Sequence, residues 1–264
     1  MLTAQIPVNL LRQKLAAGPV TGGIQIMASA DVTEVLAGVG LGMLMIDHEH
    51  GFGGLGDLVA QLRALKGTGV AALVRVPSHD ETYAHRLLDA GVESILFPGV
   101  ESAAAARAAV RACRYPPHGT RGAGGGLRAS GYDTDMDYYG RANDKLLIGV
   151  QIESKAGVEA AAEIAAVDGI GLIVIGPRDL SASIGKLGQF ADPQVMALFA
   201  EAEKRVLASG VAMGSVIYPG MDLAGMFARG HRLILAGSDV AWLAKSARAA
   251  ATAAAPASLV VSAP

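Results

Sequence analysis

Short apolar runs alternate with longer segments of helical periodicity along most of the chain. The apolar runs are nearly continuous rather than strictly alternating, which is typical of strands that are buried on both faces of a parallel sheet. Eight such strands are predicted, over Gly23–Met27, Met43–Asp47, Ala72–Val76, Ser94–Pro98, Leu146–Glu153, Leu172–Gly176, Val211–Tyr218 and Arg232–Ala236.

A helical pattern follows each predicted strand. Ser102 is suited to cap the start of one of these helices, and Gly38 is suited to end another. The predicted helices are Asp31–Ala37, Gly56–Leu65, Glu81–Ala90, Ser102–Arg114, Gly157–Ala166, Pro193–Ser209, Met221–Arg229 and Ser238–Ala254.

Eight strand–helix units in 264 residues average about 33 residues each, which favours a single (β/α)8 TIM barrel over residues 1–264. A doubly wound open sheet is the alternative, although that fold more often has about five to seven strands and a glycine-rich first turn. Two additions to a minimal barrel are expected. They are an amphipathic helix over Leu11–Ala17 and a long loop over Tyr115–Asp144, between strands four and five. The tail after Pro256 is expected to fray.

Composition and charge narrow the class of protein. Hydrophobic residues make up 52% of the chain and charged residues 17%, which excludes a disordered chain and supplies a large core. The 22 basic and 24 acidic residues leave no basic excess, so nucleic acid is not an expected partner. There is no secretory signal and no uninterrupted membrane span, and the single cysteine, Cys113, cannot form an internal disulfide. The sequence therefore predicts a soluble, cytoplasmic protein.

Two acidic residues stand where neighbouring strands end. In a TIM barrel the active site lies at the carboxyl ends of the strands, so polar residues there are candidates for chemistry. Glu153 ends an otherwise apolar strand, and Asp179 follows the next strand, 26 residues later. Two adjacent carboxylates completed by water suit Mg²⁺ or Mn²⁺. The alternative is that Glu153 pairs with an arginine and Asp179 caps a helix.

The exits of strands two and three carry the other candidates. The segment from Asp47 to Gly51 reads DHEHG, but its histidines lack the spacing and partners of a zinc site. A histidine beside carboxylates suits general-base catalysis near neutral pH, while packing within the turn is the preferred interpretation of His48. Arg75 interrupts strand three and is suited to hold a carboxylate or an enolate. A structural bridge to Asp47 or Glu49 is the alternative.

Two further features carry weaker predictions. The glycine run within Pro116–Gly126 is compatible with an anion site or a mobile lid, but it lacks the lysine and hydroxyl of a P-loop. Lys155 follows Glu153 in a loop and interrupts no strand, so Schiff-base catalysis by a lysine is disfavoured.

With these residues assembled, the chain resembles the HpcH/HpaI family of class II, metal-dependent pyruvate aldolases, of the 4-hydroxy-2-oxoheptanedioate aldolase type. Each matching segment alone would indicate the family with only modest specificity. Together the five segments are highly specific, and they span most of residues 20–240. They are IDHEHG at 46–51, LVRVP at 73–77, RYPPHGTRG at 114–122, VQIESKAGVE at 150–159 and VIGPRDLSASIG at 174–185.

The resemblance assigns roles to five residues. It implies a TIM barrel in which one Glu and one Asp hold a divalent cation, Mg²⁺, Mn²⁺ or Co²⁺, and Glu153 and Asp179 match these positions. It implies that Arg75 binds the pyruvyl oxygen. It also implies that His50 moves a proton while paired with an aspartate that matches Asp89.

The substrate pocket is expected to include the turn before Asp179. The glycine–proline pair of the family matches Gly176 and Pro177, and Arg178 occupies a position that is commonly small. His48 likewise stands where the family often has a small residue. These departures leave the metal and enolate chemistry in place and concern the choice of aldehyde.

The implied reaction is the reversible aldol cleavage of a 4-hydroxy-2-oxo acid into an aldehyde and pyruvate or a related 2-oxo acid. One alternative is a CoA-thioester lyase of the citrate lyase β-subunit or malyl-CoA lyase type, for which no strong Lys/Arg cluster is visible. Another is a non-catalytic barrel that binds a 2-oxo acid. The resemblance further implies a homohexamer in which the last helix, Ser238–Ala254, swaps between subunits.

Overall fold

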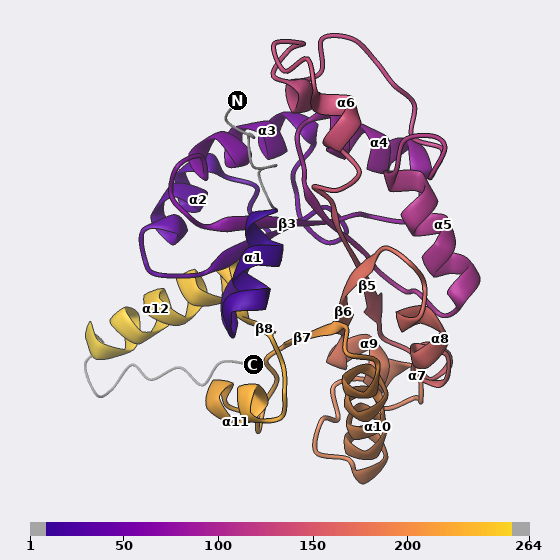
Figure 1. Ribbon diagram of the computed structural model, residues 1–264. Coiled ribbons are helices and arrows are strands. Elements are labelled where there is room, and N and C mark those ends of the chain that lie inside the picture. The colour runs from indigo at the N-terminus through magenta and orange to yellow at the C-terminus, as the bar shows by residue number, and fades with distance from the viewer. Residues whose placement is uncertain (1–8, 255–264) are drawn as a thin grey trace.

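The computed structural model describes residues 9–254 as a closed barrel of eight strands with helices around it (Figure 1). The strands are parallel and follow one another around the barrel in chain order, and β8 pairs with β1 to close it. The predicted (β/α)8 fold is therefore confirmed, and the open doubly wound sheet is excluded. The predicted fraying after Pro256 lies outside the described residues.

The strands lie close to their predicted positions. The largest difference is in β1, which begins three residues early because Val20, Thr21 and Gly22 pair with β8. The strands are β1 (Val20–Gln25), β2 (Met43–Asp47), β3 (Ala71–Arg75), β4 (Ser94–Phe97), β5 (Leu147–Ile152), β6 (Ile170–Ile175), β7 (Ala212–Val216) and β8 (Leu233–Ser238).

The helices also agree with the predicted ranges, with three corrections. The helix predicted over Gly157–Ala166 is two short helices that meet at Ala160, where Arg205 donates a hydrogen bond to the Glu159 carbonyl (2.7 Å). A short helix after β6 and another within the predicted loop between strands four and five were not predicted. The helices are α1 (Leu10–Ala17), α2 (Ala30–Ala37), α3 (Leu55–Ala64), α4 (Glu81–Asp89), α5 (Ala103–Cys113), α6 (Tyr138–Arg141), α7 (Lys155–Glu159), α8 (Ala161–Ala165), α9 (Pro177–Ala182), α10 (Pro193–Ser209), α11 (Leu223–Ala228) and α12 (Asp239–Ala254), with a 3-10 turn η1 (Arg128–Ser130).

The N-terminal helix closes one end of the barrel. Leu11 and Leu15 of α1 are buried against the residues that fill the barrel interior. The side-chain amide of Asn9 donates hydrogen bonds to the carbonyls of Glu93 (2.9 Å) and Lys145 (3.0 Å). The predicted amphipathic helix is thus confirmed, and it plugs the end of the barrel at which the strands begin. The inward-facing cluster includes Met43, Met45, Leu73, Leu96, Leu147, Leu172, Leu233 and Leu235.

The long segment between α5 and β5 packs on the outside of the barrel. Its anchor is Arg121, which is buried and donates to Asp89 at the end of α4 (2.7 Å) and to the hydroxyl of Tyr138 (3.2 Å). The same guanidinium lies 4.4 Å from the centre of the Tyr115 ring. These contacts hold the segment against α4 rather than over the carboxyl ends of the strands.

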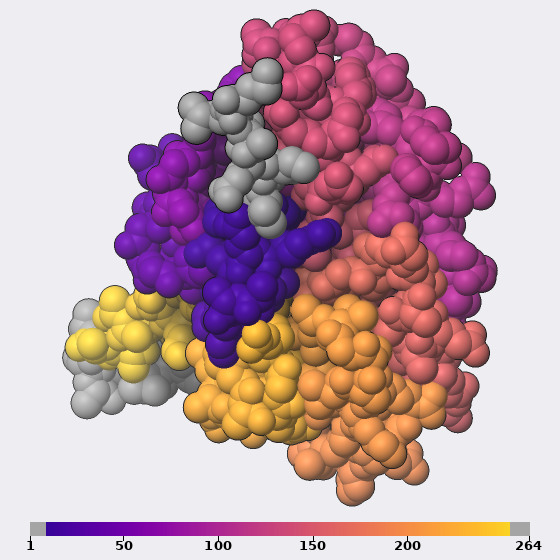
Figure 2. Space-filling model, in the orientation of Figure 1, coloured from indigo at the N-terminus to yellow at the C-terminus, as the bar shows by residue number. Residues whose placement is uncertain are grey.

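The C-terminal helix α12 leaves the barrel after its first turn. Trp242 packs against β1 and β8 at two glycines, because a Cβ at Gly23 or at Gly237 would lie 2.6 Å from its ring. The side chains from Leu243 to Ala253 are exposed, and the helix stands out from the barrel in the space-filling view (Figure 2). Within residues 9–254, no helix has the length and apolar character needed to cross a membrane.

Candidate active site

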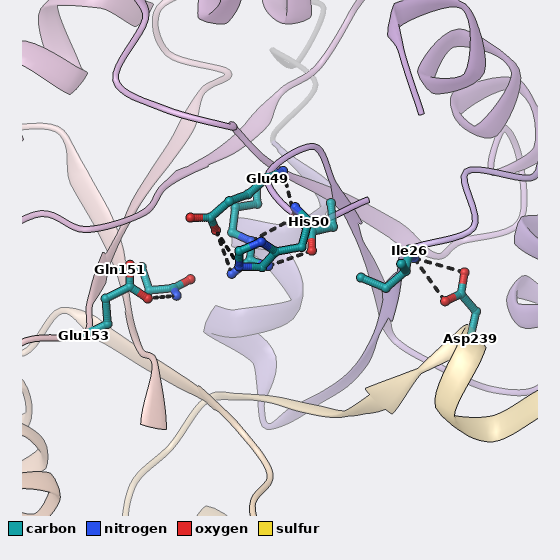
Figure 3. A network of polar contacts seen from close by, with 8 residues as sticks. Ile26, Glu49, His50, Gln151, Glu153 and Asp239 are labelled. Carbon is teal, nitrogen blue, oxygen red and sulfur yellow. Dashed lines mark hydrogen bonds and ion pairs between the residues drawn. The ribbon is translucent and has the colours of Figure 1, made fainter. Parts of the chain in front are cut away.

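The turn after β2 is fixed from within by its first residue. The Asp47 carboxylate accepts hydrogen bonds from the backbone N–H groups of Glu49 (3.0 Å) and His50 (3.3 Å). Gly51 completes the turn, and a Cβ there would overlap the carbonyl oxygen of Asp47. The turn therefore needs an aspartate and a glycine at these positions, and it presents Glu49 and His50 above the barrel (Figure 3).

Arg75 ends β3 directly beside Asp47 and bridges the two acidic residues of the turn. Its Nε and Nη2 donate to the Asp47 carboxylate at 3.0 and 2.6 Å, and its Nη1 lies 3.0 Å from Oε2 of Glu49. Burial opposes the charge of Asp47, but the hydrogen bonds and charge of Arg75 outweigh it and lower the pKa of that carboxyl. The bridge that the sequence left as an alternative is formed. A guanidinium has five N–H donors, and Asp47 accepts from two of them, so three form no hydrogen bond with the described residues.

Glu153 follows β5 and is held by its neighbours on either side. Its Oε1 accepts a hydrogen bond from the backbone N–H of Gly99 (2.7 Å), and its Oε2 accepts one from the side chain of Gln151 (Figure 3). A Cβ at Gly176 would lie 2.7 Å from Oε2, so glycine at the end of β6 lets the two strand exits approach. Burial, and then the nearby charges of Asp179 and Glu49, raise the pKa of Glu153.

Asp179 lies in the first turn of α9, at the exit of the strand next to Glu153. Its charge contributes to the raised pKa of Glu49, for which burial is the larger cause. Oε2 of Glu49 is buried, and despite the nearby guanidinium it accepts no hydrogen bond from the described residues. Glu49 and Glu153 thus have raised pKa values beside Asp179, and Arg75 is the cation that bridges the turn.

This donor set fits a hard divalent cation. Carboxylate oxygens are the ligands that Mg²⁺ and Mn²⁺ prefer, and Mg²⁺ usually takes one or two from the protein and the rest from water or substrate. Among residues 9–254 no three His, Cys, Asp or Glu side chains form a metal cluster by themselves. Glu153 and Asp179 could therefore supply two ligands, with the remaining positions open to small molecules.

A cavity of about 380 Å³ opens at this end of the barrel. Its polar lining includes Asp47, His50, Arg75 and Asp179, together with the turn at Gly176 and Pro177. The rest of the lining is largely apolar and includes one further cation, Arg178. These residues are Ile24, Ile26, Arg178, Phe190, Val216, Ile217, Tyr218 and Pro219. A cavity with both charged and apolar lining suits a small molecule with a polar reacting end.

The structure brings some predicted residues together and separates others. The His50 side chain is 63% exposed, and its Nε2 lies 3.8 Å from Oε2 of Glu49. Asp89 lies at the far end of α4 and pairs with Arg121, and no described contact joins it to His50. His48 is buried, with Nδ1 2.8 Å from the Tyr83 hydroxyl, which supports packing within the turn as its role.

Two weaker predictions are also resolved. The cavity has no lining residue from the predicted Tyr115–Asp144 loop, so the glycine run does not contribute to it in the described chain. The ammonium of Lys155 is exposed and faces Glu159 at 3.9 Å, which gives no support to a buried catalytic lysine.

Sequence reasoning gave no role to three residues that shape the site. Gln151 holds Glu153, and its polar side chain within an apolar strand was the available signal. Glu49 was visible within DHEHG but had no assigned function. Asp239 directly follows β8, and nothing in its sequence context pointed to the backbone groups that it binds.

Comparisons with known proteins agree with this geometry. The family model HpcH/HpaI aldolase/citrate lyase matches residues 26–246. A hydroxypyruvate/pyruvate aldolase of Roseovarius nubinhibens is 38% identical over 244 residues, which cover 92% of this chain and 95% of the relative. A 4-hydroxy-2-oxovalerate aldolase of Novosphingobium aromaticivorans is 40% identical over 245 residues, which cover 92% and 93%.

A solved structure gives the same result. The crystal structure of an HpcH/HpaI aldolase/citrate lyase family protein from Burkholderia cenocepacia matches with a TM-score of 0.88 and 35% identity, and the match covers 93% of this chain and 99% of that one. Sequence and fold therefore agree over nearly the whole chain. The protein belongs to the HpcH/HpaI aldolase/citrate lyase family.

Proposed function

We propose that the protein is a class II pyruvate aldolase, which reversibly cleaves a 4-hydroxy-2-oxo acid into an aldehyde and pyruvate or a related 2-oxo acid. The observation that carries this proposal is the convergence of Glu153, Asp179, Arg75 and His50 at one end of the barrel. The aldolase names of the relatives support the reaction class.

Glu153 and Asp179 would hold the divalent cation, Mg²⁺, Mn²⁺ or Co²⁺. When bound, the cation supplies electrostatic stabilisation for the negative charge that develops on the keto oxygen of the substrate. Gly99 and Gln151 fix both oxygens of Glu153. The carboxylate is therefore oriented before any ligand arrives.

Arg75 acts as the fixed positive charge of the protein at the same oxygen. Its pairing with Asp47 and Glu49 sets the plane of the guanidinium, and its remaining N–H donors are available to the substrate. A donor that is already oriented loses little in reorganisation when the enolate forms. The ion pairs of Arg75 with Asp47 and Glu49 are thus compatible with substrate binding by Arg75, because they orient the guanidinium.

His50 moves the proton. In the aldol direction it takes a proton from C3 of pyruvate, and after the new C–C bond forms it returns a proton to the former aldehyde oxygen, which becomes the 4-hydroxyl. In cleavage the two steps run in reverse. The exposed imidazole stands in the wall of the cavity, where it can reach a substrate held by Arg75.

We assign the partner of His50 to a second copy of the chain. α4 starts near the strand exits and runs antiparallel to the strands for nine residues, about 13 Å, so Asp89 lies toward the opposite end of the barrel. Arg121 holds Asp89 there within the same chain. The expected pairing of Asp89 with His50 therefore requires an oligomer, as the expected hexamer would provide.

We place Arg178 on the side of the cavity that receives the aldehyde, which is the acceptor in the aldol direction. It lines the cavity beside Tyr218 and Phe190, and it forms no ion pair with any described residue. Arg75, in contrast, is already engaged by Asp47 and Glu49. We therefore expect Arg178 to favour aldehydes that carry an anionic group. Gly176 and Pro177 shape the floor of the same pocket.

The test is exchange of the C3 protons of pyruvate with solvent deuterium, followed by NMR in the presence and absence of Mg²⁺, Mn²⁺ and Co²⁺. Exchange that depends on the metal and stops in EDTA supports the proposal. Exchange that persists in excess EDTA would overturn it. Aldehydes added with pyruvate or hydroxypyruvate then define the acceptor, and CoA thioesters in the same assay would reveal a thioester lyase.

A further inference from the structure

A buried carboxylate binds the backbone of a neighbouring loop at the edge of the site. Asp239 begins α12, is 4% exposed, and forms no ion pair within the described chain. Its oxygens accept hydrogen bonds from the N–H groups of Ile26 (3.0 and 3.1 Å), Met27 (3.0 Å) and Val240 (2.7 Å). Backbone donors and the N-terminus of α12 thus compensate its charge.

The peptide unit between Ile26 and Met27 links Asp239 to the turn that carries His50. The N–H of Met27 and the carbonyl of Ile26 belong to one planar peptide unit, so fixing the N–H also fixes the direction of the carbonyl. That carbonyl accepts a hydrogen bond from the N–H of Phe52 at 3.0 Å. Phe52 lies two residues after His50, and its own side chain is 80% exposed. The backbone, rather than the phenyl ring, therefore anchors this end of the turn.

The loop that Asp239 binds is not held in this shape by its own sequence. Ala28, directly after Met27, has φ of 54°, a left-handed conformation that alanine rarely adopts. Its side chain lies against Gly53, where an added Cβ would collide with it. A strained residue of this kind persists only where surrounding contacts hold it, and the hydrogen bonds from Met27 and Ile26 to Asp239 supply them.

We propose that Asp239 is a positioning residue for His50. His50 lies between two anchors, the carboxylate of Asp47 on its own N–H and the Ile26 carbonyl on the N–H of Phe52. Asp239 fixes the second anchor, because the Met27 N–H that it binds and the Ile26 carbonyl belong to one planar peptide unit. It does not line the cavity and touches no reacting atom. It acts through the backbone of Ile26, whose carbonyl anchors the turn that carries His50. This inference rests on the proposed role of His50 as the base.

The first experiment measures pyruvate proton exchange in Asp239→Asn, with folding checked by circular dichroism. Asparagine keeps the size of the side chain, but only one of its two terminal atoms can accept. The N–H groups of Ile26, Met27 and Val240 can therefore no longer all be satisfied. We expect kcat to fall about tenfold with KM within about twofold, because the base is displaced while substrate binding is retained. Asp239→Ser, which still suits a helix start, is expected to lose about 100-fold.

The matched control is Asp222→Asn. Asp222 caps α11 by accepting from the N–H of Gly225 (2.8 Å), and it has no contact with the turn that carries His50. We expect it to leave the exchange rate unchanged. Amide hydrogen exchange supplies a readout without substrate, because Asp239→Asn should accelerate exchange at Phe52 and Asp222→Asn should not.

The decisive measurement is a double-mutant cycle. In a His50→Ala background, Asp239→Asn is expected to change the residual exchange rate by less than about twofold, since the group that it positions is gone. An equal tenfold loss in that background would overturn the proposal, as would a wild-type rate in Asp239→Asn itself. In the unmodified protein, a Phe52 amide that exchanges far faster than that of Met27 would also overturn it. A lack of exchange in the wild type would instead contradict the proposed function.

Discussion

The two ends of the barrel use polar groups in opposite ways. Where the strands begin, every polar atom of the Asn9 side chain has a partner. The oxygen accepts from the N–H of Arg12, and the amide donates to Glu93, Ser94 and Lys145. Where the strands end, Glu49 retains a buried oxygen with no hydrogen bond from the described residues. Burial, and then the nearby carboxylates, raise the pKa values of Glu49 and Glu153.

The difference separates stability from catalysis. At the closed end the chain satisfies its own buried groups, so packing of α1 contributes to the free energy of folding. At the open end groups are left for ligands to satisfy, which weakens the empty protein and strengthens the complex. Substitutions at the closed end should therefore change stability, and substitutions at the open end should change catalysis.

The largest effect is expected at the carboxylates of the open end. Glu153→Gln and Asp179→Asn should each reduce pyruvate exchange and metal affinity together, on the order of 10³-fold in rate, because several kcal/mol of electrostatic stabilisation depend on the cation. In EDTA both variants should remain folded by circular dichroism, because the buried core of the barrel does not depend on the cation. Glu159→Gln, an exposed glutamate on α7, is the control. A full rate in either site variant would contradict the prediction.

The two histidines of one turn provide the next contrast. His50→Ala should lower pyruvate exchange about 10²–10⁴-fold, the range for loss of a general base. His48→Ala should affect it much less, because His48 is buried against Tyr83 and does not line the cavity. Steady-state exchange by NMR for both variants checks the assignment. A larger loss in His48→Ala would show that the wrong histidine had been chosen.

At the closed end the effect should appear in stability. Leu11→Ala should cost about 2–5 kcal/mol of unfolding free energy in chemical denaturation, since it removes a buried side chain from the base of the barrel. Below the melting transition, kcat should stay at the wild-type value. Leu10→Ala, at an exposed position in the same helix, should change little. A drop in kcat for Leu11→Ala with unchanged stability would contradict the assignment of stability to the closed end and of catalysis to the open end.

The smallest effect is expected at Arg178, on the acceptor side of the open end. Arg178→Ala should reduce the preference for a carboxylate-bearing aldehyde over a neutral one of equal length by about tenfold in kcat/KM, the value of one charge-assisted hydrogen bond. Arg178→Lys should retain most of the preference because it keeps the charge. An unchanged ratio in Arg178→Ala would show that the guanidinium points away from the acceptor.

The sequence was sufficient for the barrel because its signals are local and repeated. Apolar runs and helical periods locate strands and helices to within a few residues, and the same order places Glu153, Asp179, Arg75 and His50 at one end. α9 was missed because six residues are too few for a periodic pattern, and the break at Ala160 depends on Arg205, 45 residues away.

The rest of the site depends on contacts that no local pattern encodes. Asp239 binds backbone N–H groups, which are present at every residue, so only the fold reveals which ones it reaches. Asp89 was assigned through a family resemblance, and within one chain Arg121 occupies it. The long loop was expected near the chemistry because long loops often are functional, but Arg121 fixes it to the outer face of α4.

The contact of Trp242 with two glycines has a spectroscopic consequence. It is the chain's single tryptophan, and it lies one helical turn after Asp239, on the segment that joins α12 to β1 and β8. The tryptophan emission of the protein therefore originates at this junction. When a ligand enters the cavity or another molecule covers α12, a change in the wavelength or lifetime of that emission would register it without any added label.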